Sequence, residues 1–135
     1  MKHKILIVDD EEEIRFLVRD FFESERYEVI EAADADALRE LFKGSPPDVV
    51  LLDLKLPDAN GLTLLPEVKK TWPDSRIIIL TGYGTPEAAK TAFKLDDLFL
   101  QNKPFDLGML RTLVEMALQQ KAKLGTDIAA AKAAN

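Results

Sequence analysis

Several short apolar runs of this 135-residue chain lead into residues whose side chains can do chemistry. Asp9 and Asp10 follow the run KILIV, Asp53 follows VVLL, Thr81 follows RIIIL, and Lys103 lies just beyond the run LFL. Carboxylates, a hydroxyl and an ammonium group are the groups that bind a hard divalent cation and handle a phosphoryl group. The residue types therefore point to metal-assisted phosphate chemistry.

The three aspartates explain why a metal ion is expected. Carboxylates about 4 Å apart repel by roughly 4 kcal/mol per pair at an effective dielectric of 20. Mg²⁺ offsets this repulsion, since it prefers oxygen ligands and bridges carboxylates to phosphate oxygens. We expect Asp10 and Asp53 to bind Mg²⁺ directly and Asp9 to act through a water molecule. The backbone carbonyl of Lys55, just after Asp53, is expected to add another ligand.

Asp53 is the expected nucleophile, because carboxylates are known phosphoryl acceptors. The cation and Lys103 would neutralise charge on the phosphoryl oxygens, and the Thr81 hydroxyl would donate a hydrogen bond to one of them. Each residue taken alone has an ordinary alternative: a strand or helix cap for an aspartate, a surface cation for Lys103 and a turn residue for Thr81. Their joint occurrence at four strand ends favours the functional interpretation.

The elements that must position these residues alternate regularly along the chain. Apolar or β-branched runs predict five strands, at residues 4–8, 27–31, 49–52, 76–80 and 98–100. A helical pattern or a helix start signal follows each of them, including Thr85 and Pro86 as N-cap and first residue of the fourth helix. Five repetitions of strand then helix predict an α/β fold with a doubly wound parallel sheet and right-handed crossovers. The strand ends of such a sheet share one edge, where ligands bind.

Two helices carry specific expectations. The first opens on three glutamates, whose charge suits a helix N-terminus. Its core face is expected to carry the apolar residues at helical spacing, which are Ile14, Leu17, Val18, Phe21 and Phe22. Asp34 is the expected N-cap of the second helix, which runs to Phe42.

Composition limits the possible functions. With 47% hydrophobic and 31% charged residues, the chain matches one ordinary globular domain. The absence of cysteine excludes disulfides and thiolate chemistry, and the single histidine, His3, leaves little for a zinc site. A formal net charge of −6 argues against direct binding to nucleic acid. There is no membrane-length apolar run and no cleavable signal pattern, so we expect a cytoplasmic protein.

Four motifs carry a resemblance to a known family. ILIVDDE, VLLDLKLPDANG, ILTGYGTPE and KPFD occur in the order and spacing of the receiver domains of two-component response regulators. The chain resembles this family from Lys4 to about Leu118. TGYGT and KPFD are similar to the receivers of transcriptional activators of the nitrogen-regulatory class.

The resemblance implies a flavodoxin-like fold, with strand order 2-1-3-4-5 and five helices. It also implies that Asp53 is phosphorylated by a sensor histidine kinase or phosphotransfer protein, while Asp9 and Asp10 hold Mg²⁺. Thr81 would switch and Lys103 would contact the phosphoryl group. Partner binding or homodimerisation would use the fourth helix, fifth strand and fifth helix, and an effector domain would belong to the full-length protein.

Other classes fit less well. A flavin carrier needs a phosphate loop rich in hydroxyls and amides after the first strand, where this chain has five consecutive acids from Asp9 to Glu13. A haloacid-dehalogenase-like phosphatase normally has a second acid where Lys55 stands. The remaining alternative is an unphosphorylated pseudo-receiver that acts as an interaction scaffold.

Two further features concern the end of the chain. Residues 1–120 are expected to form the receiver, and residues 121–135 a helical extension, the start of a linker or a cloning remnant.

Receivers usually carry an aromatic residue three positions before the lysine, where this chain has Leu100. We favour a bulge at Asn102, which would bring Phe99 into that position. A regular strand would leave Leu100 there.

Overall fold

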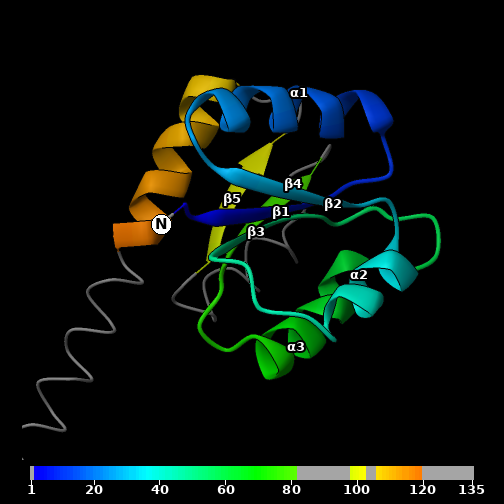
Figure 1. Cartoon of the computed structure of the whole chain (residues 1–135). Helices are drawn as coiled ribbons and strands as arrows, with labels where there is room; N and C mark the ends of the chain where they lie inside the picture. The colour runs from blue at the N-terminus through cyan, green and yellow to red at the C-terminus, as the bar shows by residue number, and fades with distance from the viewer. Residues whose placement is uncertain (1, 82–97, 103–105, 120–135) are drawn as a thin grey trace, which may run out of the picture.

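The computed structural model describes residues 2–81, 98–102 and 106–119 (Figure 1). The predicted helix that starts at Thr85 and Pro86, the residue Lys103 and the segment 121–135 lie outside this part. The elements, in chain order, are β1 (Lys4–Val8), α1 (Glu12–Ser24), β2 (Glu28–Ala32), α2 (Ala35–Leu41), β3 (Val49–Asp53), α3 (Gly61–Thr71), β4 (Arg76–Thr81), β5 (Leu98–Asn102) and a helix over residues 107–119.

The strands form one sheet in the order β2-β1-β3-β4-β5, and all four pairings are parallel. The predicted parallel α/β architecture is therefore confirmed. β3 lies in the centre, and each of its residues is buried. A strand covered on both faces needs apolar side chains on both, which is why VVLL reads as a continuous run.

Helices cover both faces of the sheet (Figure 1). Leu6 and Val8 of β1 belong to the core layer beneath α2 and α3. Ile5 and Ile7 belong to the layer beneath α1 and the helix at 107–119. Successive side chains of a strand point to opposite faces, so the register of each strand decides which side chains enter which layer.

The core face of α1 is narrower than predicted. Val18 and Phe22 are fully buried, whereas Leu17 is 54% exposed, so its placement in the core was wrong. At 3.6 residues per turn, Leu17 lies about 100° around the helix from Val18. The residues that pack on the sheet follow the stripe through Ile14, Val18 and Phe22, which leaves Leu17 at its border.

The start of α2 agrees with the prediction. The Asp34 carboxylate accepts a hydrogen bond from the Ala37 amide at 2.8 Å, which is the geometry of an N-cap. At the other end, Phe42 meets Trp72 edge to face, with ring centroids 4.9 Å apart. Trp72 directly follows α3, at the end of the helix remote from Gly61.

β5 corrects one prediction. Its pairing with β4 is unbroken from Ile77 with Leu98 to Thr81 with Asn102. The bulge at Asn102 is therefore wrong, because a bulge would leave one residue of the strand unpaired. The regular strand is observed, and Leu100 pairs with Ile79.

The described helices include none that is both long and apolar enough to span a membrane.

Candidate functional site

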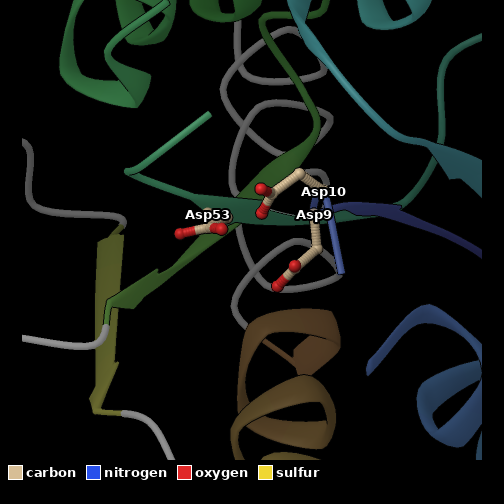
Figure 2. Close-up of side chains that lie close together, drawn as sticks. All are labelled: Asp9, Asp10 and Asp53. Atoms are coloured by element: carbon tan, nitrogen blue, oxygen red, sulfur yellow. The ribbon is translucent and has the colours of Figure 1, made fainter. Parts of the chain in front are cut away.

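The register of the sheet brings two acidic strand ends together. Val8 pairs with Leu52, so Asp9 and Asp53 take the next position on these adjacent parallel strands. Neighbouring strands lie only about 4.8 Å apart, so this register brings the two carboxylates close together. Asp10, the next residue, completes the group (Figure 2).

The three aspartates form one compact cluster. One carboxylate oxygen of each residue lies within 4.8 Å of those of the other two. Asp9 and Asp53 are buried, with 0% and 3% exposure, whereas Asp10 is exposed. The cluster is thus a buried pair of carboxylates that opens to solvent on the side of Asp10.

Contacts from β2, from α1 and from the turn between β1 and α1 fix Asp9. Its amide donates to the Ala32 carbonyl at 3.1 Å, and its Oδ1 accepts from the Glu11 amide at 2.9 Å. Its carbonyl oxygen accepts from Nη1 of Arg15 at 2.7 Å. Arg15 is held in turn by an ion pair with Glu31 of β2, at 3.3 Å. The turn between β1 and α1 is therefore anchored to β2 and to α1.

The loop between β3 and α3 surrounds Asp53. The Lys55 amide donates to Oδ1 of Asp53 at 3.0 Å, which fixes the carboxylate and places the Lys55 peptide beside it. Lys55 also forms a bridge with Asn60, and the Gly61 amide donates to the Leu54 carbonyl at 2.8 Å. These bonds fold residues 54–60, which connect β3 to α3, back onto the end of β3. We call this segment the β3–α3 loop.

Gly61 is required by close approach of two backbone segments. A Cβ atom at this position would lie 2.6 Å from the Asp53 carbonyl oxygen and 2.6 Å from the Leu54 Cα. Both atoms belong to the backbone, so neither can move aside as a side chain would. A residue without a side chain lets α3 begin directly against the end of β3.

The donor set suits a hard cation. Three carboxylates within 4.8 Å of one another repel by on the order of 3 kcal/mol per pair at an effective dielectric of 20. A divalent cation removes this repulsion, and Mg²⁺ favours oxygen ligands and retains several waters. The exposed side of Asp10 leaves room for such waters. The residues of the cluster therefore fit a magnesium site.

The remaining predicted residues are only partly described. Asp53 pairs with Leu80, so Thr81 follows at the same edge of the sheet as the cluster. The side chain of Thr81 and all of Lys103 lie outside the described residues. Their roles remain predictions.

Sequence reasoning missed two groups near the site. Arg15 and Glu31 support Asp9, and the only local signal was an acid within the strand EVIEA. Asp58 is the second group, and it accepts hydrogen bonds from the first two amides of α2. Its partners lie more than twenty residues away, and no local pattern predicts them.

Comparisons with known proteins agree with this geometry. A family model described as the response regulator receiver domain matches residues 5–115. The chain is 35% identical over 122 residues to sporulation initiation phosphotransferase F of Bacillus subtilis, covering 90% of this chain and 98% of that protein.

A larger regulator and a solved structure are also similar. The chain is 35% identical over 121 residues to the nitrogen assimilation regulatory protein NtrX of Azorhizobium caulinodans, covering 88% of this chain and 27% of that protein. It thus spans about a quarter of the larger regulator. A CheY-like receiver domain protein from Methanospirillum hungatei JF-1 matches with a TM-score of 0.83 and 30% identity, covering 91% and 98% of the two chains.

Proposed function

The chain belongs to the response regulator receiver domains of two-component systems, and from this membership we propose that Asp53 is its phosphoacceptor, beside a Mg²⁺ ion. Asp10, Asp53 and the Lys55 carbonyl are the proposed direct ligands of that ion, and Asp9 is proposed to hold it through a water molecule. Phosphoryl transfer to an aspartate is the general function of the family. The observation that carries the proposal is the convergence of three carboxylates at the end of β1 and β3.

The proposed reaction is a nucleophilic displacement at phosphorus. A carboxylate oxygen of Asp53 attacks the phosphoryl group of a phosphohistidine, so that a P–O bond forms and the P–N bond breaks. The bonding electrons stay on the imidazole nitrogen, which takes up a proton. Mg²⁺, when bound, neutralises charge on the aspartates and on the phosphoryl oxygens.

The surrounding residues orient the nucleophile. The hydrogen bond from the Lys55 amide holds the Asp53 carboxylate in one orientation, and burial limits access of water to it. Lys103 is proposed to neutralise a phosphoryl oxygen, and the Thr81 hydroxyl to donate a hydrogen bond to another. Movement of Thr81 toward the phosphoryl group would then report the modification to a partner.

The partners follow from the family. We propose a sensor histidine kinase or phosphotransfer protein as phosphoryl donor and an effector domain as recipient of the signal. The receiver unit is proposed to cover residues 1–120, with five strands and five helices. A homodimer would use the fourth helix, β5 and the helix at 107–119, where Met109 is 52% exposed.

Labelling with acetyl phosphate tests the phosphoacceptor. We expect the chain to gain one phosphoryl group in the presence of Mg²⁺, as seen by intact-protein mass spectrometry, and Asp53→Asn to gain none. Asp20→Asn, at an exposed position of α1, is the matched control and should label like the wild type. Labelling of Asp53→Asn would place the acceptor elsewhere. A wild-type chain that stays unlabelled would favour the pseudo-receiver scaffold.

A further inference from the structure

Asp58 connects the β3–α3 loop to a different part of the fold. Its Oδ1 accepts from the Ala35 amide at 2.9 Å, and its Oδ2 accepts from the Asp36 amide at 3.1 Å. These are the first two amides of α2, and helices lack intrahelical acceptors for their first amides. α2 therefore has two capping side chains, Asp34 from its own N-terminus and Asp58 from the loop.

The same loop contains Lys55, whose backbone carbonyl is a proposed metal ligand. The start of the loop is tied to β3 by the Lys55 amide, which donates to Asp53, and its two ends are joined by the Gly61 amide, which donates to the Leu54 carbonyl. Asp58 lies between these two points and supplies an anchor outside the loop itself. The position of Lys55 thus depends on these local bonds, on the bond from the Leu54 amide to the Leu80 carbonyl of β4 at 3.1 Å, and on the attachment of Asp58 to α2.

We propose that Asp58 is a positioning residue of the metal site, which holds the Lys55 carbonyl in place by fastening the β3–α3 loop to α2. This inference rests on the proposed function, since it concerns the ligand that Lys55 would supply. Groups that orient metal ligands change metal affinity by about 10- to 100-fold when they are removed. Asp58 acts through the loop, so we expect the lower end of that range.

The charge of Asp58 suits this role. Its pKa is lowered from the ordinary value, first by the hydrogen bond from the Ala35 amide and also by the Asp36 amide and the charge of Arg39, with burial acting in the opposite direction. Asp58 therefore remains ionised at neutral pH, and charge-assisted bonds to amides are stronger than neutral ones.

A second pair of hydrogen bonds holds α2, the helix to which Asp58 is bonded, against α3. Arg39 of α2 makes two hydrogen bonds to the Glu67 carboxylate of α3, at 3.3 and 3.0 Å. α2 is therefore bonded both to the middle of the loop, through Asp58, and to α3, the helix that follows the loop. This frame opposes displacement of the loop relative to β3.

A matched pair of variants separates positioning from capping. Asp58→Ala and Asp34→Ala each remove one negative charge and one cap of α2, so both should lower the urea midpoint without metal. Only Asp58→Ala should weaken Mg²⁺ binding, by about tenfold, when Mg²⁺ is titrated into the 135-residue chain and followed by calorimetry. It should also shift the Lys55 amide resonance before any metal is added, and Asp34→Ala should not.

Equal Mg²⁺ affinity of the two variants would overturn the inference and leave Asp58 a helix cap. If Asp58→Ala does not fold, Asp58→Asn and Asp34→Asn decide in the same way, because asparagine keeps one acceptor oxygen. A wild-type chain that binds no Mg²⁺ would overturn the proposed metal site, and the positioning role with it. If the wild type binds Mg²⁺ and both variants lose the same amount of Mg²⁺ affinity, the positioning role is refuted and the proposed metal site stands.

Discussion

Replacing Gly61 by alanine tests how tightly the start of α3 is built against Asp53. The new Cβ would lie 2.6 Å from the Asp53 carbonyl oxygen, whereas ordinary contacts begin at 3.4 Å. The two backbone segments must therefore separate by about 0.8 Å. The shift would fall on the residue that carries the proposed phosphoacceptor.

The expected cost combines two opposing effects. Alanine in place of glycine in a helix normally stabilises by roughly 0.5 to 1 kcal/mol. Overpacking of a tight site costs about 1 to 3 kcal/mol. The midpoints of these two ranges leave a net loss of about 1 kcal/mol, with a drop in Tm of roughly 4 °C per kcal/mol. Because misplacement of a reacting group by about 1 Å can cost about 100-fold in rate, labelling should slow by about 10- to 100-fold.

Gly44→Ala is the matched control. Its Cβ would meet the Leu41 carbonyl oxygen at 3.6 Å, an ordinary contact, and the position is exposed. This variant should change the free energy of unfolding by no more than about 1 kcal/mol and leave labelling unchanged. Urea unfolding and the rate of acetyl phosphate labelling measure the two effects. Wild-type stability and rate in Gly61→Ala would refute the close-approach argument.

Three further predictions concern metal, pH and fluorescence. Mg²⁺ at 100 times its Kd should add about 2.7 kcal/mol to the free energy of unfolding and raise Tm, an effect that Asp10→Asn should remove; an unchanged Tm would count against the site. Folding lowers the pKa of Asp58 from 3.8, so the contribution of its charge to the stability of the fold is complete above pH 3.8 and is lost as the pH falls through the lower pKa of the folded state. The difference in urea midpoint between the wild type and Asp58→Asn should therefore narrow at about pH 3. A constant difference would contradict the ionic cap. Trp72 follows the 11-residue helix α3, about 16 Å along its axis from Gly61, so its fluorescence should barely respond to Mg²⁺, and strong quenching would disprove this.

Local patterns were sufficient for the architecture and for the acidic cluster. Strands covered on both faces must be apolar throughout, so their ends are visible in the sequence wherever a charged residue follows. The shared edge of a parallel sheet then brings Asp9, Asp10 and Asp53 together without knowledge of any individual contact. The roles of Thr81 and Lys103 rest on the same reasoning and remain predictions.

Other features depended on how the elements meet in space. The exposure of Leu17 depends on which side of α1 faces the sheet, and the regular pairing of β5 depends on its register with β4. The bonds of Asp58 to α2 and the approach of Gly61 to β3 depend on the path of one loop. The sequence by itself determined the periodic elements and the acids at their ends, because periodicity is a property of neighbouring residues. Only the tertiary structure decided which atoms hold those acids in place, since such contacts join residues that no local pattern relates.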